Sequence, residues 1–440
     1  MTGTRTTQGG DPRGPGASLL EELAERGLVA DHTDRSALES RLDSPTPLYC
    51  GFDPTADSLH IGNLQSIMLL RRFQLAGHPP VALVGGATGM IGDPSGRSSE
   101  RQFLDSEVLD ANRAAIGAQL GTLLDFEGEA AATLVDNRDW TGSVGVLEFL
   151  RDVGKYVTVS TMLAKESVKG RMDRESGISF TEFSYMLLQA NDFYVLHTDR
   201  GVDLQVAGSD QWGNITAGVD LIRRRTGDVA HGLTAPLIVR SDGSKFGKSE
   251  GENIWLSADR TSPYQMYQYL LNVPDDDVED LLARLTTVPV PECREVGASH
   301  LAAPEKREGQ RRLAREVVAL IHGPEVVPVI EAAAAVWFGG SVLDAAADTL
   351  EMLAGETPST SLAHDEVVGA DPLELFCRTP LAKSKGEIRR NSSGYYLNQV
   401  GLAERDGGEA AAVTDRDLLH GRFLLLQRGR KARHLIVIEP

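Results

Sequence analysis

A chain of 440 residues, 41% of them hydrophobic, is long enough for about three globular domains, and its net charge of −19 argues against a nucleic-acid partner for the chain as a whole. It has no run of 18 apolar residues, and the polar residues 1–17 lack the apolar stretch of a secretory signal, so we expect a cytoplasmic protein with no membrane span and a disordered N-terminal tail. Its three cysteines, Cys50, Cys293 and Cys377, form no CxxC pair, which argues against structural zinc and a disulfide framework.

The first half of the chain predicts a parallel β-sheet. Residues 46–52 are typical of a buried strand, residues 64–76 place apolar side chains at helical spacing, and residues 79–86 form a second apolar strand. A strand, a helix and a strand in such a short stretch indicate a βαβ unit with parallel strands. Two more strands that run into polar loops are expected in "VDLQVAGSDQWGN" and "TAPLIVRSDGSKFGKS".

The second half predicts a helical block followed by a smaller module. Residues 262–353 show mostly helical periodicity, and residues 355–372 are typical of a linker. The block 373–440 ends in "FLLLQRGRKARHLIVIE", which predicts two strands around a basic turn. This block carries 12 Lys and Arg against 8 Asp and Glu, which suggests a polyanion partner, although ordinary charge scatter on a solvated surface explains it equally well.

A glycine pattern after the second strand needs a separate interpretation. Gly86, Gly89 and Gly92 have the GxxGxxG spacing found in dinucleotide-binding loops. Such a loop must lead straight into a helix whose N-terminus holds the pyrophosphate. Here Asp-Pro-Ser-Gly follows at once and would interrupt that helix. We therefore do not expect a dinucleotide site.

Two other stretches suit phosphate binding. His60, Gly62 and Asn63 lie where a strand passes into a helix, so unpaired backbone N–H groups and the helix dipole favour an anion there. Lys245 and Lys248 lie in a loop rich in Gly and Ser and could neutralise a leaving pyrophosphate. Taken singly, the first stretch is more often a helix cap and the second a solvated loop.

Together, in this order, the two stretches resemble the HIGH and KMSKS signatures of class I aminoacyl-tRNA synthetases, here HIGN and KFGKS. The resemblance narrows to the bacterial tyrosyl-tRNA synthetases and covers residues 18–440. It is carried by "LYCGFDPTADSLHIGNL", "LVGGATGMIGDPSGRSSER", "SYMLLQANDF", "LQVAGSDQWGNI" and "KFGKS". The block "PLELFCRTPLAKSKGEIRRNSSGYYLN" is similar to an S4-type RNA-binding module.

The resemblance implies an α/β fold in several parts. A Rossmann-like, parallel-sheet catalytic domain would span residues 18–250 and end with the KFGKS loop. A helical anticodon-binding domain (251–354), a linker (355–372) and an S4-like domain (373–440) would follow. The implied substrates and partners are L-tyrosine, ATP with Mg²⁺ and tRNA(Tyr). No zinc is expected, and the enzyme would be a homodimer.

The family's site residues carry over onto matching positions of this chain. The resemblance assigns transition-state and phosphate contacts to Thr55, His60, Arg97, Arg101, Lys245 and Lys248. It assigns the ATP ribose and the nucleotide cradle to Cys50, Gly51, Asp53, Gly62, Asn63 and Asp210, with Lys248 again on the phosphates. It assigns the tyrosine pocket to Tyr49, Asp93, Tyr185, Gln189, Asp192, Gln205 and Gln211.

Within the tyrosine pocket, Tyr49 and Asp192 would bind the phenol. Tyr185, Gln189 and Asp192 are spaced i, i+4 and i+7, which places three polar groups on one face of an otherwise apolar helix and favours a polar pocket over a structural network.

The chain differs from the general signatures at Asn63, which replaces the second His of HIGH, and at Phe246-Gly247, which replaces Met-Ser of KMSKS. Two alternatives remain: a catalytically inactive synthetase-like RNA-binding protein, and a tryptophan-specific relative.

Overall fold

The computed structural model describes residues 14–95, 104–165, 168–169, 172, 177–241, 243, 246–249, 252–405, 408, 411–429 and 431–439. Three residues expected at the phosphate end, Arg97, Arg101 and Lys245, lie outside this set, as do residues 1–13 of the expected tail. The chain forms two compact units, one made of Met1–Thr261 and Tyr269–Ile321, the other of Ser262–Gln268 and His322–Pro440.

A five-stranded sheet forms the centre of the first unit, with strand order β3-β2-β1-β4-β5 and every neighbouring pair parallel. Its strands are β1 (Leu48–Phe52), β2 (Pro80–Val84), β3 (Thr133–Asp136), β4 (Leu204–Gly208) and β5 (His231–Ala235). This sheet confirms the predicted βαβ unit. The order reverses between β1 and β4, and ligands bind α/β sheets beyond the carboxyl ends of the strands at such a switch point.

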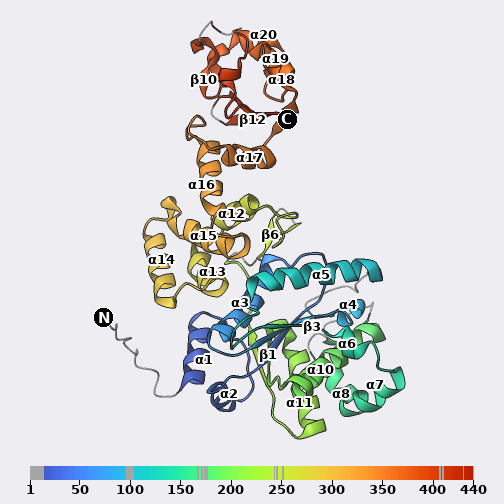
Figure 1. Ribbon diagram of the computed structural model, residues 1–440. Helices are drawn as coiled ribbons and strands as arrows, with labels where there is room; N and C mark the ends of the chain where they lie inside the picture. The colour runs from blue at the N-terminus through green and yellow to red at the C-terminus, as the bar shows by residue number, and fades with distance from the viewer. Residues whose placement is uncertain are drawn as a thin grey trace. The chain divides into compact units, whose positions relative to one another are not determined.

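Helices cover both faces of this sheet. Figure 1 shows α3 (Ile61–Leu75) and α5 (Ser106–Leu123) on one side and α10 (Phe180–Arg200) and α11 (Trp212–Thr226) on the other. Tyr49, Leu83 and Val135 from the strands pack with Phe193 and Leu196 from α10 in one apolar core. β2 is buried along its whole length and β1 at every position but Gly51, which explains their continuous apolar sequences, whereas the edge strand β3 leaves Leu134 exposed.

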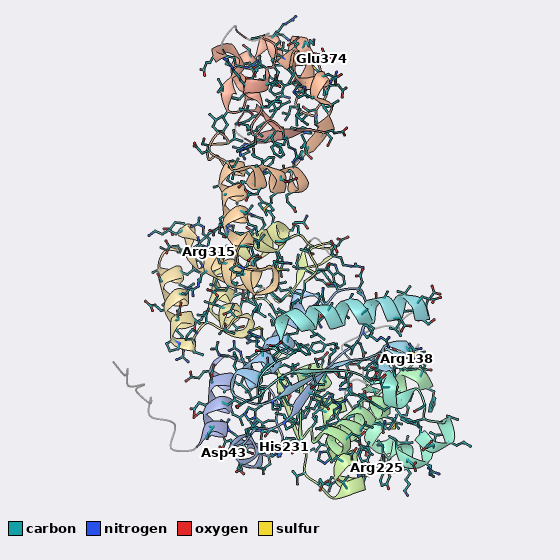
Figure 2. All side chains as sticks on the ribbon, in the orientation of Figure 1. Asp43, Arg138, Arg225, His231, Arg315 and Glu374 are labelled. Atoms are coloured by element: carbon teal, nitrogen blue, oxygen red, sulfur yellow. The ribbon has the colours of Figure 1, made fainter. Side chains whose placement is uncertain are left out.

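A cationic contact ties α11 to its neighbour. Arg225, labelled in Figure 2, lies in the last turn of α11 with its guanidinium carbon 3.7 Å from the centre of the Tyr194 ring on α10. It is also 5.9 Å from the ring centre of Tyr156 in the short helix Gly154–Tyr156. Such contacts stabilise packing beyond the apolar area that they bury.

Further helices complete the first unit: α1 (Pro15–Glu25), α2 (Arg35–Leu42), α4 (Thr88–Ile91), α6 (Arg138–Thr141), α7 (Val146–Asp152), α8 (Val159–Leu163), α13 (Val278–Leu285), α14 (Val290–Ala302) and α15 (Glu308–His322). The expected tail 1–17 is too long, because α1 begins at Pro15. Proline suits the first helical turn, where its missing N–H would have no partner, and Ala17 is already buried.

The predicted helical domain is divided between the two units. Helices α13 to α15 belong mainly with the sheet, whereas α16 (Val326–Trp337) and α17 (Ala347–Glu356) belong to the second unit, and α12 (Pro263–Leu271) crosses the division. Two buried arginines explain the first assignment. Arg26 donates to the carbonyls of Ala283 and Val288, and Arg72 at the end of α3 also donates to Ala283.

The second unit contains a mixed sheet with strand order β10-β9-β11-β12-β8. Its elements are β8 (Ser359–Leu362), α18 (His364–Val367), α19 (Pro372–Cys377), α20 (Lys385–Arg390), β9 (Tyr395–Leu397), β10 (Val400–Gly401), β11 (Phe423–Arg428) and β12 (Ala432–Ile438). The antiparallel pair β11 and β12 confirms the two predicted strands around a basic turn. No helix in the described part of the chain is long and apolar enough to cross a membrane.

The prediction of a linker over residues 355–372 is wrong. This stretch contains β8, which pairs in parallel with β12 from Ser359 opposite Leu435 to Leu362 opposite Ile438, and it also contains α18. The side chain of Leu362 packs against the apolar core of the unit. The segment therefore completes the sheet that it was expected only to precede.

Candidate active site

The candidate residues gather at the carboxyl ends of β1 and β4, where the strand order reverses. Tyr49 and Gly51 lie in β1, and Asp53 follows it directly. Gln205 lies in β4, and Asp210 and Gln211 form the short 3-10 turn after it. Gly51 is the exposed position of β1, so the absent side chain leaves space for a ligand against the backbone.

One end of the site holds a buried carboxylate with two fixed donors. Asp192 on α10 is 2% exposed, and its two oxygens accept hydrogen bonds from Asn137 Nδ2 at 2.9 Å and Trp140 Nε1 at 2.8 Å. Burial raises the pKa of Asp192 to about 7, although the two donors oppose this rise by stabilising the charged form. The carboxylate can accept further hydrogen bonds from a ligand.

The hydroxyl of Tyr49 completes this end. Tyr49 is buried, its ring centre lies 5.3 Å from that of Phe193, and its hydroxyl has no hydrogen-bond partner among the described residues. Burial, followed by the charge of Asp192, raises the pKa of Tyr49 well above its ordinary value, so the hydroxyl stays protonated. A buried polar atom without a partner is costly, and a ligand hydroxyl would satisfy it.

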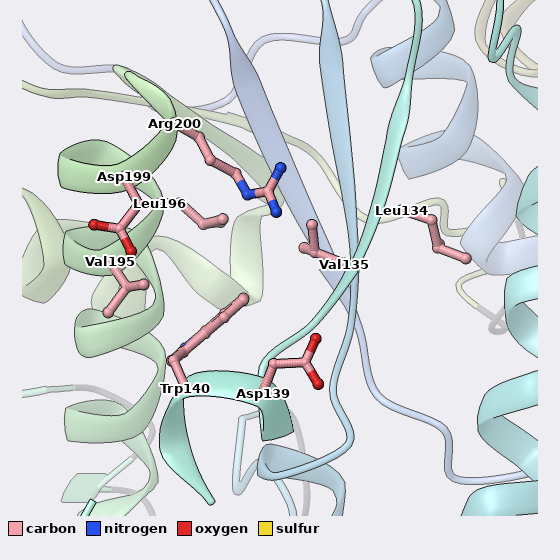
Figure 3. Close-up of a pocket in the computed structure, with 8 residues that line it drawn as sticks. All are labelled: Leu134, Val135, Asp139, Trp140, Val195, Leu196, Asp199 and Arg200. Atoms are coloured by element: carbon pink, nitrogen blue, oxygen red, sulfur yellow. The ribbon is translucent and has the colours of Figure 1, made fainter. Parts of the chain in front are cut away.

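Neither donor to Asp192 is among the residues predicted from the sequence. Asn137 and Trp140 belong to "DNRDW", a polar run that directly follows β3 at the carboxyl edge of the sheet. That position was the available signal. Trp140 also lines a pocket of about 420 Å³, together with Leu134, Val135, Asp139, Val195, Leu196, Asp199 and Arg200 (Figure 3).

Next to this end lies a group of amides and carboxylates. Gln211 Nε2 donates to Asp93 Oδ2 at 2.5 Å, and Asn214 Nδ2 donates to the side-chain oxygens of both Gln189 and Gln211, at 3.1 and 3.0 Å. The structure thus brings together Asp93, Gln189 and Gln211, as expected. It adds Asn214, which sequence reasoning missed although it lies in the quoted segment "QWGNI".

Tyr185 and Asp53 join the expected tyrosine and nucleotide positions. The Tyr185 hydroxyl donates to Asp53 Oδ2 at 2.9 Å. Burial and the nearby carboxylates raise the pKa of Tyr185 well above its usual value, so it remains a donor. Gln205 is also buried, and its Oε1 has no hydrogen-bond partner within the described part of the chain.

Cys50 and Asp210 lie on the nucleotide side. Burial, and then the charge of Asp210, raise the pKa of the Cys50 thiol to about 12, so it is a protonated, weak donor and not a nucleophile. Burial raises the pKa of Asp210 as well, with Asp93 adding to the effect. Among the described residues, no group of three His, Cys, Asp or Glu side chains is arranged to hold a metal ion.

The HIGN stretch forms the N-terminus of α3. His60 is the residue before the first turn, and its backbone N–H donates to Asn63 Oδ1 at 3.1 Å. Asn63 therefore caps the helix with its oxygen and keeps its Nδ2 donors for a ligand. A Cβ at Gly62 would lie 2.9 Å from two His60 ring atoms, so glycine gives the ring its position. Burial, above all, lowers the pKa of His60.

The described part of the KFGKS loop lies against this helix start. The Ile254 N–H donates to the Gly247 carbonyl and the Ile61 N–H to the Ile254 carbonyl, both at 2.8 Å. Gly247 has a φ of +89°, which explains glycine at this position. The hairpin of β6 (Lys248–Ser249) and β7 (Glu252–Asn253) leaves Lys248 exposed. The two motifs, far apart in sequence, are thus joined through their backbones.

Tyr269 holds the same loop and was not found from the sequence. Its hydroxyl accepts a hydrogen bond from the Gly247 N–H at 2.7 Å, and its ring centre lies 5.7 Å from that of the buried Phe246. Phe246 and Gly247, the departure from Met-Ser, therefore have defined packing roles. Thr55 lies exposed in the turn after β1, where its N–H donates to the Asp53 carbonyl.

A parallel sheet with its polar residues at the switch point, a helix N-terminus and a lysine-bearing loop is typical of a nucleotide-binding α/β enzyme. The family model for "tRNA synthetases class I (W and Y)" matches residues 41–338. The chain is 49% identical over 426 residues to the tyrosine–tRNA ligase of Anaeromyxobacter dehalogenans (strain 2CP-1), covering 96% of this chain and 100% of that one.

Two further proteins support this similarity. The tyrosine–tRNA ligase of Geobacillus kaustophilus is 47% identical, over 95% of this chain and 99% of its own. The crystal structure of a C-terminally truncated mitochondrial tyrosyl-tRNA synthetase from Aspergillus nidulans matches with a TM-score of 0.64 and 35% identity, over 71% of this chain and 92% of that one. The chain belongs to the tyrosine–tRNA ligases of the class I tRNA synthetase family.

Proposed function

We propose that this site activates L-tyrosine with ATP and then transfers it to the 3′ end of tRNA(Tyr). Family membership supports the overall reaction. One observation supports tyrosine as the amino acid. At the end of the site that we call the phenol end, the buried Asp192 carboxylate lies near the Tyr49 hydroxyl, and this hydroxyl has no hydrogen-bond partner among the described residues.

In the first step, an oxygen of the tyrosine carboxylate attacks the α-phosphorus of ATP. The bond from that phosphorus to the bridging oxygen breaks, and pyrophosphate leaves with Mg²⁺, which arrives with the ATP as part of the substrate. No enzyme group is covalently modified, so the protein must act by positioning and by stabilising charge. The reaction therefore needs no enzyme nucleophile, which is consistent with a Cys50 thiol that is buried and stays protonated.

The residues at the phosphate end of the site would stabilise the charge that develops on the leaving pyrophosphate. His60 and Thr55 would contact the phosphates near the N-terminus of α3, where the helix dipole favours an anion. Lys248 would join them from the exposed hairpin. Lys245, Arg97 and Arg101 are proposed for the same task on the basis of the sequence motifs.

Ribose and cradle contacts are proposed for the residues beside β1. Cys50, Asp210 and the Nδ2 donors of Asn63 would bind ribose hydroxyls, with Gly51, Asp53 and Gly62 shaping the cradle. The exposed backbone of Gly51 supports a close approach of the nucleotide.

Amino-acid selection falls to the opposite end. Asp192 would accept the phenolic hydrogen, and Tyr49 would donate to the phenolic oxygen. Phenylalanine would leave the buried Tyr49 hydroxyl without a partner and would give the Asp192 carboxylate no donor beyond Asn137 and Trp140, and an unpaired buried polar group is costly. Enzymes of this class are a known example of such discrimination. The ammonium group would lie among Asp93, Tyr185 and Gln189, and the carboxylate near Gln211 and Gln205.

The second unit is proposed to bind tRNA as an S4-type module. A polyanion partner is supported by exposed cations on and around α20, namely Lys383, Arg389 and Arg390. A further exposed cation, Lys431, lies in the turn between β11 and β12. The helical region is proposed to meet the anticodon arm. We place the enzyme in the cytoplasm, where its tRNA substrate is used.

A homodimer is also part of the proposal. Val146, Leu147 and Leu150 are large apolar side chains exposed on α7, and Val159 is exposed on α8. Such a surface favours burial against another protein surface. We assign it to a second copy of the chain, and light scattering coupled to size-exclusion chromatography would give a mass of one chain if this assignment is wrong.

The test of the function is amino-acid-dependent ATP–pyrophosphate exchange with tyrosine, phenylalanine and tryptophan in parallel. Exchange with tyrosine alone is expected. Exchange with tryptophan would overturn the roles of Tyr49 and Asp192. A folded protein that binds tRNA and exchanges no amino acid would be an inactive RNA-binding relative instead.

A further inference from the structure

The glycine-rich turn after β2 has no part in the function described so far. Its glycines make room for side chains rather than for a phosphate. A Cβ at Gly85 would lie 2.2 Å from Asp53 Oδ1 and 2.3 Å from Thr88 Oγ1, and one at Gly86 would lie 2.3 Å from Asp136 Oδ1. At these distances a side chain at Gly85 or Gly86 would displace the carboxylates and the Thr88 hydroxyl from their positions. The turn is therefore built so that carboxylates and the Thr88 hydroxyl can approach the backbone.

Thr88 is the polar side chain that this turn contributes. It is 2% exposed, its hydroxyl donates to Asp53 Oδ1 at 2.8 Å, and the same oxygen accepts a hydrogen bond from Asn137 Nδ2 at 2.9 Å. Asn137 is fully buried, and its Nδ2 also donates to Asp192 Oδ2 at 2.9 Å. The side-chain amide oxygen of Asn137, Oδ1, accepts a hydrogen bond from the backbone N–H of Ala87, the residue before Thr88, at 2.7 Å.

These bonds form one continuous path through the interior. It runs from Asp192 through Asn137 and Thr88 to Asp53, and from Asp53 to the Tyr185 hydroxyl. An amide nitrogen carries two hydrogens, and both of those on Asn137 are used, one for each acceptor. The position of the Thr88 hydroxyl oxygen therefore influences the orientation of the Asn137 amide, and through it the orientation of the Asp192 carboxylate. That oxygen is held in turn by Asp53.

We infer that Thr88 is a positioning residue that fixes the carboxylate of the phenol end and the carboxylate of the nucleotide cradle relative to each other. This inference rests on the proposed function, because it takes Asp192 and Asp53 as members of the tyrosine and ATP sites. Buried polar networks behave in this coupled way, since each member polarises and orients the next. Loss of the Thr88 hydroxyl should weaken the binding of both substrates, although Thr88 is buried and is not among the residues proposed to contact either of them.

The experiment compares Thr88→Val with Trp140→Phe. Thr88→Val removes the hydroxyl that bonds to both Asn137 and Asp53, whereas Trp140→Phe removes a hydrogen bond that Trp140 donates to Asp192. Two quantities are measured for each full-length variant: the dissociation constant of tyrosine by equilibrium dialysis, and the KM for ATP in pyrophosphate exchange at saturating tyrosine. Thr88→Val is expected to raise both about tenfold, because Asn137 Nδ2 and Asp53 Oδ1 each lose the hydrogen bond that they make with the Thr88 hydroxyl. Trp140→Phe is expected to raise only the first.

Two controls separate positioning from general destabilisation, and a second hydroxyl-deleted variant covers a failure to fold. Thr88→Ser keeps the hydroxyl and should restore both constants to within about twofold of the wild type. Thr286→Val removes another buried hydroxyl of the same unit, one bonded to the Leu282 carbonyl, and should change neither constant. If Thr88→Val does not fold, Thr88→Ala removes the same hydroxyl without adding a methyl group and gives the same comparison.

The possible results are distinct. A folded hydroxyl-deleted variant that weakens tyrosine alone, ATP alone or neither overturns the inference. A wild-type protein that shows no tyrosine-dependent exchange overturns the proposed function instead. Tyrosine-dependent exchange in the wild type, with both constants raised by loss of the Thr88 hydroxyl and restored by Ser, supports the two together.

Discussion

The two ends of the candidate site are built by different means. At the tyrosine end, buried side chains hold one another: Asp192 is fixed by Asn137 and Trp140, and Tyr185 by Asp53. At the phosphate end the backbone provides the order, through the bonds that join Gly247, Ile254 and Ile61, and the cation that it presents, Lys248, is exposed.

This difference follows from what each end must do. Rejecting phenylalanine requires polar groups whose positions are fixed and dry before the substrate arrives. Stabilising the charge on a leaving pyrophosphate requires cations that reach a large, solvated anion. Such cations can stay exposed to solvent, provided that the backbone places the loop that carries them beside the phosphates. Changes at the two ends should therefore separate into effects on tyrosine binding and effects on turnover.

The largest effect is expected at the phosphate end. Lys248→Ala should lower the kcat of tyrosine activation by about 100- to 1,000-fold, since it removes a charge that acts mainly in the transition state. The dissociation constant of tyrosine should stay unchanged. Pre-steady-state formation of tyrosyl-adenylate measures the first quantity and dialysis the second. Lys306→Ala, at another exposed lysine, is the control. A comparable loss of tyrosine affinity would erase the contrast between the two ends.

Asp192→Asn should give the next largest effect, now on the amino acid. The kcat/KM for tyrosine should fall by about 10- to 100-fold, because a hydrogen bond to a charged acceptor is replaced by one to a neutral amide. The kcat/KM for phenylalanine should change far less, so discrimination shrinks. Asp199→Asn, at an exposed position of the same helix, should change neither value. An equal loss for both amino acids would mean that Asp192 is structural.

The pH dependence of tyrosine binding sharpens the same contrast. An ordinary aspartate, with a pKa of about 4, would be ionised throughout pH 5–8 and would give a flat profile. Burial raises the pKa of Asp192 to about 7, so the accepting carboxylate is lost as the pH falls below that value. Tyrosine affinity should fall about tenfold between pH 8 and pH 6. In Asp192→Asn the profile should be flat, and a slope that persists there would point to another group.

The smallest effect is expected from Tyr269→Phe. This change keeps the ring against Phe246 and removes the acceptor of the Gly247 N–H, a buried donor. Turnover should fall by about fivefold, corresponding to about 1 kcal/mol, because the loop that carries Lys248 is held less firmly. Tyrosine affinity should not change. A variant with full turnover would show that the backbone bonds to Ile254 are sufficient on their own.

The sequence could predict what depends on local pattern. The βαβ unit follows from apolar periodicity, and the stripe of Tyr185, Gln189 and Asp192 on α10 follows from helical spacing. The position of Asn137 after β3 indicates a site residue, but its partner and that of Tyr269 could not be predicted, because each lies more than 20 residues away in the chain and only the fold brings them together. Their neighbours in sequence give no hint of those partners.

The glycine turn and the missed strand show the same limit. The spacing of Gly86 and Gly89 is that of a phosphate loop, yet Gly85 and Gly86 instead admit carboxylates, a requirement that comes from Asp53 and Asp136 elsewhere in the chain. Residues Ser359–Leu362 have the composition of a linker, and they form a strand only because β12 offers them an edge. In both cases a distant segment decides the outcome.

The pairing of β8 with β12 has a practical consequence for cutting the molecule. A fragment that begins at residue 373, the start of the S4-like block expected from sequence, would lack β8 and leave β12 from Leu435 to Ile438 paired with β11 on one edge only. An open edge beside an apolar core is a template for aggregation. An isolated C-terminal fragment should therefore begin before Ser359, and a shorter one is expected to be found in inclusion bodies.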